Sequence, residues 1–416
     1  MNTETKYDLV IFGASSFIGQ ILVKALGDAI ENELNVRWAI AGRSKEKLSA
    51  IQQSLIDTHS LQVDTLIADA QDDEALKNLC ASTRVVVSTV GPFALYGEGL
   101  VRACCESGTD YCDITGEAHW ILQMISKYQH AAAESGARII HSCAFDSVPS
   151  DLGVFFTQQK AIELLGQPCQ DIQMRVIKMK GRFSGGTYAS ALNVAKDLSE
   201  NPSLRRALAS PYCLCPSEHS FTQRQPRHRH AEYEAQSESW IAPFVMEGIN
   251  TRIVHRSNAL LGKLYGKDFR YDEAIVTGTG RKGRKRASRT SYGLWLFGFF
   301  ATIPLFSAAM QRWLLPKPGE GPSHEEQESG YYELIFRGKA PGRGNIQCRL
   351  KGEKDPGYGA SAMIVAQVAL CLAFDIEKAQ PSGGFWTPAS ILGETLIPRL
   401  SDHASLNFEI DTVKKR

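Results

Sequence analysis

Three side chains that could supply or accept a proton stand just beyond short apolar runs. Asp113 opens the segment Asp113 to Glu117, and Asp146 lies in the segment Cys143 to Asp151. Tyr96 follows a Gly-Pro turn that ends another apolar run. Acids and phenols at one edge of a sheet can orient a substrate or act as general acids, so these three are the candidate catalytic residues. Alternatively, Asp113 anchors backbone amides and Asp146 caps a turn.

A glycine-rich turn, Gly13 to Gly19, links the first apolar run to an amphipathic stretch. Gly13 permits a tight turn, and Gly19 permits close packing of the following helix. The N–H groups at the start of that helix can then face a pyrophosphate. Ser16 stands where GxxGxxG loops have their middle glycine, and its hydroxyl could itself bind phosphate. The turn therefore predicts a dinucleotide site, although strand-to-helix turns also use glycine for steric reasons alone.

The second apolar run ends in Ala41-Gly-Arg43-Ser44 and has no acid where an NAD-binding domain holds the ribose 2′-hydroxyl. Arg43 is placed to bind a 2′-phosphate instead, and Lys45 and Lys47 add positive charge nearby. We therefore predict NADP(H) as the cofactor, with Arg43 and Ser44 in contact with it. The alternative for Arg43 is a solvated arginine at a helix start.

Two further strand ends are predicted to line the cofactor. Asp69 ends the third run, where an acid can accept a hydrogen bond from the adenine amino group, or it could cap a helix from Gln71 to Leu79. The fourth run ends in a Gly-Pro turn at the carboxyl edge of the sheet, where ligands lie in open α/β folds. Its backbone at Val90, Gly91 and Pro92 is expected to line the cofactor.

Short apolar runs alternate with helical stretches over residues 7 to 145, as in a doubly wound α/β fold of the Rossmann type with a parallel sheet. Strands are predicted at Tyr7 to Phe12, Val36 to Ala41, Val63 to Ala68, Arg84 to Val90, Tyr111 to Ile114 and Arg138 to Ser142. Helices are predicted at Gly19 to Ala29, at Ser44 to Leu55 with Ser44 as N-cap, and at Gly97 to Ser107 closed by Gly108.

The length of 416 residues predicts two domains, and the alternation is lost after about Asp151. We expect a cofactor domain at residues 1–150 and a substrate domain at residues 151–416, whose C-terminal part could pack back on the first.

Bulk composition excludes several classes of partner. A net charge of +1, with 22% charged residues, gives no global field that would gather nucleic acid. The ten cysteines form no CxxC pair, so neither a metal site nor a disulfide framework is expected. The polar N-terminus lacks the order of a signal peptide. Together these features predict a cytoplasmic protein with reduced thiols.

The most unusual segment is uncharged and aromatic, from Gly293 to Met310, and six cations crowd its N-terminal side. Three interpretations of the wider segment 290–313 are open. It could span a bilayer, although Pro304 and two glycines weaken a straight helix. It could lie in the membrane interface, with Trp295 and Trp313 as anchors, or it could be a buried helix. Reversible peripheral attachment to the inner membrane face is the prediction we retain.

The chain resembles the saccharopine dehydrogenase-like oxidoreductases, in particular the branch that includes the trans-acting enoyl reductases. The resemblance covers nearly the whole chain, with its motifs in the same order and at similar spacing. They are GASSFIG at 13–19, AGR at 41–43, VGPFALYGEGLVRACCESGTDYCDITGE at 90–117, FDSVPSDLG at 145–153, SGGTYAS at 184–190, LPKPGEGPS at 315–323, ESGYYELIFRG at 328–338 and GGFWTPASILGETLIPRL at 383–400.

This resemblance implies an NADP-binding Rossmann domain followed by a mixed α/β substrate domain. It also implies reduction of a carbon–carbon double bond in polyketide or lipid precursors, as in glycolipid biosynthesis. The loop at Asp146 corresponds to the loop beside the nicotinamide in saccharopine-forming relatives. The cofactor contacts carried over by position are Gly13, Ser15, Ser16, Phe17, Ile18, Gly19, Arg43 and Gly91.

The predicted partner is therefore an apolar small molecule or acyl substrate, with a peripheral membrane surface as a second partner and no nucleic acid. A homodimer is compatible with the sequence, which leaves the oligomeric state open. Two alternative functions remain at this point. One is a membrane- or lipid-associated scaffold that retains the Rossmann fold without turnover. The other is an amino-acid dehydrogenase of the saccharopine type, which the long apolar stretch and the missing cations disfavour.

Overall fold

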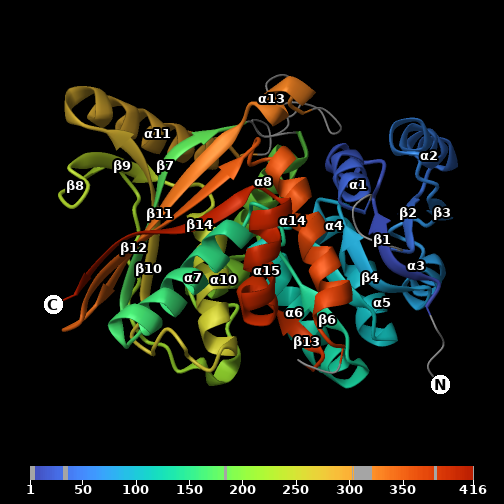
Figure 1. Ribbon diagram of the computed structural model, residues 1–416, viewed down its shortest axis with the longest axis horizontal. Coiled ribbons are helices and arrows are strands. Elements are labelled where there is room, and N and C mark those ends of the chain that lie inside the picture. The colour runs from blue at the N-terminus through green and yellow to red at the C-terminus, as the bar shows by residue number, and fades with distance from the viewer. Residues whose placement is uncertain are drawn as a thin grey trace.

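Two seven-stranded sheets form the framework of the protein (Figure 1). The computed structural model describes residues 5–30, 36–181, 185–301, 303, 321–378 and 382–415. Sheet A lies toward the N-terminal end of the molecule and sheet B toward the C-terminal end, with helices between them. The chain is therefore an α/β protein built on a parallel sheet and a second, mixed sheet.

Sheet A is parallel throughout, with the strand order β13-β6-β5-β4-β1-β2-β3. Its strands are β1 (Tyr7–Phe12), β2 (Trp38–Gly42), β3 (Asp64–Ile67), β4 (Thr83–Ser88), β5 (Asp110–Asp113), β6 (Arg138–Ile140) and β13 (Gly384–Trp386). Six of them overlap the predicted strands. The prediction of six strands was wrong in number, because β13 arrives from the C-terminal region and pairs with β6.

Sheet B has the order β14-β12-β11-β7-β10-β9-β8, and only β7 and β10 pair in parallel. Its strands are β7 (Asp171–Lys180), β8 (Glu232–Glu234), β9 (Ser239–Pro243), β10 (Arg270–Gly278), β11 (Tyr331–Ala340), β12 (Gly344–Glu353) and β14 (Leu406–Lys415). Alternate residues of its long strands are apolar and buried, so one face packs on helices while the other carries polar side chains.

The helices pack on both faces of sheet A and on the inner face of sheet B (Figure 1). Those of the first part are α1 (Phe17–Ile30), α2 (Lys45–His59), α3 (Asp73–Ala81), α4 (Phe93–Tyr96), α5 (Glu98–Ser107), α6 (Ala118–Ser135) and α7 (Val148–Leu165). The later ones are α8 (Gly185–Glu200), α9 (Pro202–Ala207), η1 (Ser217–His219), α10 (Glu247–Leu260), α11 (Gly280–Ala301), α13 (His324–Glu328), α14 (Gly359–Leu370), the π-helical turn η2 (Cys371–Asp375) and α15 (Pro388–His403). None of the described helices is both long and apolar enough to cross a membrane.

Local signals placed two helix ends correctly, whereas α2 continues to His59, four residues beyond the predicted Leu55. Ser44 caps α2 by accepting a hydrogen bond from the Lys47 N–H at 3.3 Å, and Gly108 closes α5 with a φ of +74°. Helix α1 begins at Phe17, two residues before the predicted start.

Alternating residues of β1 divide the apolar interior into two cores. Leu9 and Ile11 belong to a core that continues through α14, α7 and α15 to sheet B. Val10 and Phe12 face the other side, with α3, α5 and α6. Because the larger core is shared by both sheets, the C-terminal part of the chain is packed directly against the cofactor domain.

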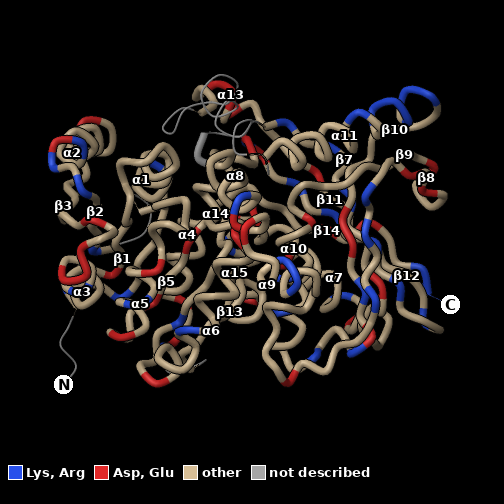
Figure 2. The backbone as a smooth tube through the Cα atoms, turned by 180° about the vertical axis from the view of Figure 1, so that it is seen from behind, with Lys and Arg blue, Asp and Glu red and all other residues tan. Residues whose placement is uncertain are grey.

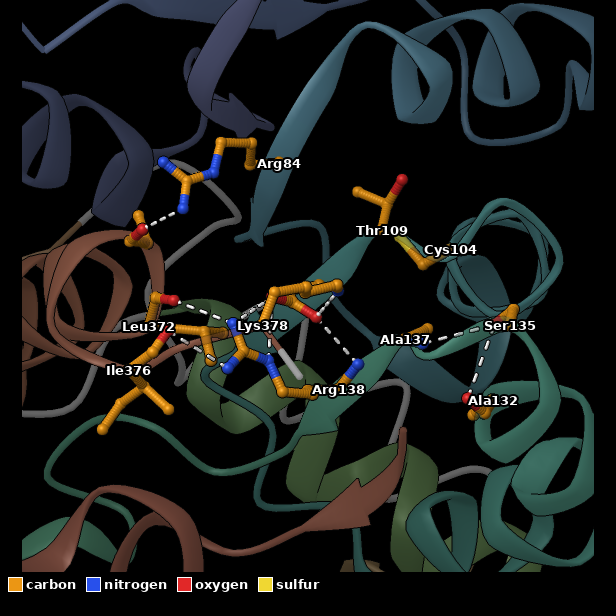
Figure 3. Close-up of polar contacts among 12 residues, drawn as sticks. Arg84, Cys104, Thr109, Ala132, Ser135, Ala137, Arg138, Leu372, Ile376 and Lys378 are labelled. Carbon is orange, nitrogen blue, oxygen red and sulfur yellow. Dashed lines mark hydrogen bonds and ion pairs between the residues drawn. The ribbon is translucent and has the colours of Figure 1, made fainter. Parts of the chain in front are cut away.

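A buried ion pair at the amino edge of sheet A holds that packing in place (Figure 3). Arg138 and Asp110 are 1% and 2% exposed, and the Nε of Arg138 donates to Oδ2 of Asp110 at 3.0 Å. The same guanidinium donates to the carbonyl oxygens of Leu372 at 3.0 Å and Glu377 at 3.1 Å, and Lys378 pairs with Asp110. Ligands bind at the opposite, carboxyl edge of such sheets, so this cluster serves structure.

Candidate functional site

The strand order of sheet A marks where a dinucleotide would lie. The order reverses between β1 and β4, and ligands of open α/β sheets bind beyond the carboxyl ends of the strands at that point. The first half of a dinucleotide would then lie over β1, β2 and β3, and the second half over β4, β5 and β6. The predicted contacts stand on the loops that leave this edge.

The glycine-rich turn has the geometry that close approach of a ligand requires. Gly13 has a φ of +90°, and a β-carbon there would lie 2.6 Å from Cγ2 of Val90 and 2.7 Å from Oγ1 of Thr89. A β-carbon at Gly19 would lie 2.2 Å from the carbonyl oxygen of Gly13. Neither position can hold a larger residue without a shift of the loop. The first turn of α1 therefore starts close to the sheet edge.

Thr89 fixes this turn from the neighbouring strand, a role that the sequence analysis missed. Its hydroxyl donates to the carbonyl oxygen of Gly13 at 2.9 Å and lies 3.0 Å from Oγ of Ser16. Oγ of Ser16 also accepts from the Gly19 N–H at 2.9 Å. The Ser16 hydroxyl is thus engaged within the loop, while Ser15, Phe17 and Ile18 are half-buried around it.

Arg43 is exposed beyond the end of β2, and among the described residues it has no ion-pair partner. Ser44 beside it is the α2 N-cap. The exposed guanidinium leaves room for a 2′-phosphate, and this role of Arg43 stays a prediction. Asp69 lies beyond β3 and accepts from the Gln71 N–H at 2.9 Å. The alternative role of Asp69, as the cap of a helix from Gln71 to Leu79, is wrong, because α3 begins at Asp73 and Asp72 is the N-cap of that helix.

The loop after β4 reaches the same edge beside the glycine-rich turn. Val90 is half-buried against Gly13, Gly91 is exposed and Pro92 precedes α4. Tyr96, at the end of α4, is 39% exposed, and its neighbour Leu95 is 59% exposed. These side chains are therefore open to a ligand, and the role of Tyr96 remains a prediction.

Asp113 is fully engaged inside the protein. It is 0% exposed, and Oδ1 accepts from the N–H groups of Thr115 and Ser142 at 3.1 and 3.0 Å. Oδ2 accepts from the Tyr111 hydroxyl at 2.9 Å and lies 2.6 Å from Nδ1 of His141. This arrangement favours the anchoring role that the sequence left open for Asp113.

Asp146 differs from Asp113 in its exposure and in its hydrogen-bond partners. It is half-buried in the loop after β6, and no other described side chain forms a hydrogen bond or ion pair with its carboxyl group. A β-carbon on Gly116 would lie 3.6 Å from its Oδ1 and 3.9 Å from the Met246 methyl group. Desolvation raises the pKa of Asp146 to about 7, and its own backbone N–H offsets part of this effect. The site thus holds an acid that is half protonated near neutral pH beside an apolar side chain.

Helix α8 is tied to this edge at several points along its length. Oγ1 of Thr187 lies 3.0 Å from the Tyr358 hydroxyl, and the Tyr358 ring packs on Phe17 of the glycine-rich turn. Ser190 donates to Oε1 of Glu117 at 3.0 Å. Ser184, in the motif at 184–190, lies outside the described residues. Within the described ranges, no group of three His, Cys, Asp or Glu side chains could hold a metal ion.

The described part of the aromatic segment lies on α11, and its large rings face solvent. Tyr292, Trp295 and Phe299 are 62%, 58% and 50% exposed, and their rings are stacked at centroid distances of 5.8 and 5.6 Å. Gly283, Ala287 and Ser291 occupy the covered face of the helix. The buried-helix interpretation is therefore wrong for residues 290–301. Residues 302 and 304–320 lie outside the described part of the chain.

Comparisons with known proteins bear on the family and the fold of the chain. Residues 9–140 match the family model of the saccharopine dehydrogenase NADP binding domain. The chain is 32% identical over 413 residues to a trans-acting enoyl reductase of Mycobacterium bovis, covering 95% of this chain and 96% of the relative. A Mycobacterium tuberculosis protein assigned provisionally to the same activity is 37% identical over 411 residues, covering 96% of each chain.

A likeness in fold extends to a solved saccharopine dehydrogenase (L-Glu forming) from Saccharomyces cerevisiae. The two structures superpose with a TM-score of 0.53, covering 98% of this chain and 100% of that chain. The sequence identity is 9%, so this likeness concerns the arrangement of both sheets and carries no residue roles.

Proposed function

The chain belongs to the family of trans-acting enoyl reductases and is an NADP(H)-dependent oxidoreductase of that type, and we propose that it reduces the double bond of an apolar, lipid-like acyl substrate. The observation that carries the substrate class is the setting of Asp146, where Gly116 and the apolar side chain of Met246 lie on the same side of the loop and no cation pairs with the carboxyl group within the described residues. An amino-dicarboxylic substrate would need cations there. Synthesis of complex lipids, glycolipids included, is the process that such a reaction would serve.

The chain's own residues divide the work at the carboxyl edge of sheet A. NADPH, when bound, supplies the hydride. The glycine-rich turn and the start of α1 would hold the pyrophosphate, and Arg43 would hold the 2′-phosphate. The loop at Val90 to Pro92 would line the nicotinamide half. Asp146, protonated below about pH 7, would hold a proton beside the reacting double bond, because desolvation raises its pKa to about 7.

Cofactor titration tests the first of these assignments. We expect wild-type protein to bind NADPH more tightly than NADH, and Arg43→Ala to lose that preference. Charge-assisted hydrogen bonds of a guanidinium are worth about 1.5–3 kcal/mol, which corresponds to about 10- to 150-fold in affinity. Calorimetric titration with both cofactors measures the change. Lys77→Ala, which removes an exposed cation on α3, is the matched control.

The result has a clear contrary form. Equal affinities of the wild-type protein for NADPH and NADH would contradict the role of Arg43.

The substrate class is tested separately, by oxidation of NADPH in the presence of 2-enoyl thioesters of increasing chain length. Turnover that rises with chain length supports an apolar acyl substrate, and turnover confined to amino-dicarboxylic acids contradicts it.

Helix α11 supports peripheral attachment to a membrane as part of the same proposal. Its first half carries six exposed cations, and Figure 2 shows basic residues gathered there at the edge of sheet B. They are Arg281, Lys282, Arg284, Lys285, Arg286 and Arg289. Cations at a helix N-terminus oppose the helix dipole, so this cluster does not serve the stability of the helix. Beside an exposed aromatic stripe it fits an anionic lipid surface, to which each cation contributes about 1 kcal/mol.

Vesicle flotation checks the attachment. We expect the protein to float with phosphatidylglycerol vesicles at low salt and to be released at high salt, because screening weakens the cationic share. The Trp295→Glu/Phe299→Glu variant should lose binding. Ile56→Glu, which alters an exposed apolar residue on α2, should keep it. Equal binding of both variants, or no preference for anionic over neutral vesicles, would argue against attachment through α11.

A further inference from the structure

A buried carboxylate outside the predicted site gathers three hydrogen bonds from two distant segments. Glu117 is 1% exposed, and it accepts from the N–H groups of Phe93 at 2.8 Å and Ala94 at 3.0 Å. Its Oε1 also accepts from the Ser190 hydroxyl at 3.0 Å. Phe93 and Ala94 begin α4, directly after the Gly91-Pro92 turn. One side chain therefore joins the loop after β4 to α8.

The hydrogen bonds that Glu117 accepts come from outside its own turn. Asp113, four residues earlier, joins the neighbouring Thr115 to Ser142, 29 residues along the chain. Glu117 joins two segments that are both distant, one 23 to 24 residues and the other 73 residues away in the chain. No Lys or Arg of the described residues pairs with it. Burying a carboxylate without a cationic partner costs free energy. We therefore attribute to its hydrogen bonds a role in fixing the position of the segments that donate them, which apolar packing alone would not fix.

Position ties this geometry to the second half of the cofactor. The loop after β4 lies on the side of the β1–β4 switch point that faces away from Arg43. Gly91 lies close to α8, since a β-carbon there would be 3.9 Å from Oγ of Ser190. On the other flank, Gly116 precedes Glu117 and lies near Asp146. The carboxylate of Glu117 thus sits behind the loops that enclose the nicotinamide half of the site.

A second buried side chain repeats the link to α8. Nε2 of His119 lies 3.1 Å from Oδ2 of Asp197, and His119 is 1% exposed. Ser190 and Asp197 are seven residues apart on α8, which places them on one face of that helix. The start of α6 therefore holds α8 across the carboxyl edge at two points, with Glu117 as the point nearest the cofactor loop.

We propose that Glu117 is a positioning residue, which fixes the loop at Val90 to Pro92 against α8 so that the nicotinamide half of the cofactor is held in one orientation. The proposal rests on the proposed function, because it requires NADP(H) at this edge. It adds a residue that neither binds the phosphates nor touches the reacting atoms. Its loss should therefore weaken binding of the nicotinamide half and leave the adenine half unaffected.

Two probes distinguish binding of the nicotinamide half from binding of the adenine half. They are NADPH and 2′,5′-ADP, which lacks the nicotinamide. In Glu117→Gln the amide carbonyl can still accept, while its NH₂ group faces an N–H donor. We expect NADPH to bind about tenfold more weakly, since hydrogen bonds to a charged group are lost, and 2′,5′-ADP to bind within about twofold of wild type. Ser190→Ala removes only the link to α8, so a loss of about threefold is expected for NADPH.

Calorimetric titrations of both probes, with thermal unfolding of each variant, decide the matter. Glu98→Gln is the control, because Glu98 lies close by on α5 but pairs with Lys127 at the surface. Unchanged NADPH binding by Glu117→Gln would overturn the assignment. Equal loss of both probes, with a lower melting temperature, would show a merely structural role and would also overturn it. A wild-type protein that binds neither probe would instead refute the proposed function.

Discussion

Replacement of Gly13 by valine is expected to abolish NADPH binding, with a loss of about 100-fold or more. Two effects act together. A valine at a φ of +90° is strained, by roughly 1–3 kcal/mol, and its β-carbon would meet Val90 at 2.6 Å and Thr89 at 2.7 Å. The loop must then move away from β4 and disturb the surface that receives the pyrophosphate. From the sequence we expected the side chain to block the pyrophosphate directly, and the structure adds the collision with β4.

Calorimetry with NADPH, together with circular dichroism, measures this loss against the state of the fold. Gly136→Val is a closely matched control, because Gly136 also has a positive φ, +83°, and has open space around its β-carbon position. It closes α6 far from the carboxyl edge. We expect this variant to bear similar backbone strain and to bind NADPH normally. Normal binding by Gly13→Val would show that the turn has only a structural role.

The parts of the site that could be predicted are those encoded by local signals. Gly13, Gly19 and Arg43 follow strands whose apolar runs are unmistakable, so a turn and a strand end could be located without a structure. Ser44 and Gly108 likewise contact residues only a few positions away in the chain, Ser44 as a helix N-cap and Gly108 as the residue that ends a helix. Such contacts depend on backbone geometry that the neighbouring residues already determine.

The parts that could not be predicted depend on contacts between distant segments. Strand β13 is three residues long, and its place in sheet A is set by pairing with β6, more than 200 residues earlier. Glu117 looks like any acid in a turn, and only the fold brings Phe93 and Ser190 to it. In the sequence Thr89 resembles any other polar residue at a strand end, and only the fold shows that its hydroxyl donates to the carbonyl oxygen of Gly13. The hydrogen-bond partners that Asp113 has and Asp146 lacks among the described side chains likewise depend on the packed protein.

Replacement of Asp146 by asparagine is expected to lower the rate of NADPH-dependent enoyl reduction by about 10²- to 10⁴-fold, the usual range for loss of a general acid. Cofactor affinity should be nearly unchanged, because the carboxyl group lies beyond β6, away from the phosphate turn. The wild-type rate should be constant below about pH 7 and fall above it, since the pKa of Asp146 is raised by desolvation to about 7 and only the protonated form can donate. Asp146→Asn should lack this decline.

The pH dependence of the free energy of unfolding gives an independent measure of the pKa of Asp146. The folded-state pKa lies above the ordinary value of 3.8, so the folded protein binds the proton more tightly than the unfolded chain. The contribution of Asp146 to the free energy of unfolding is therefore largest at low pH and is lost as the pH rises toward and through 7. Urea unfolding at pH 5.5 and pH 8 should show a smaller difference for Asp146→Asn than for wild type.

Tyr96→Phe provides the comparison that assigns the proton donor. Tyr96 is the other candidate that reaches solvent at this edge, being 39% exposed on α4. If Asp146 is the donor, Tyr96→Phe keeps the decline in rate above pH 7 and most of its turnover. If Tyr96→Phe abolishes turnover while Asp146→Asn retains it, the donor is the phenol. Asp146 would then be a half-buried carboxyl group whose pKa is raised by desolvation and by the charge of Asp113 without a catalytic role, because proximity to the reacting double bond is what turns a perturbed acid into a catalytic one.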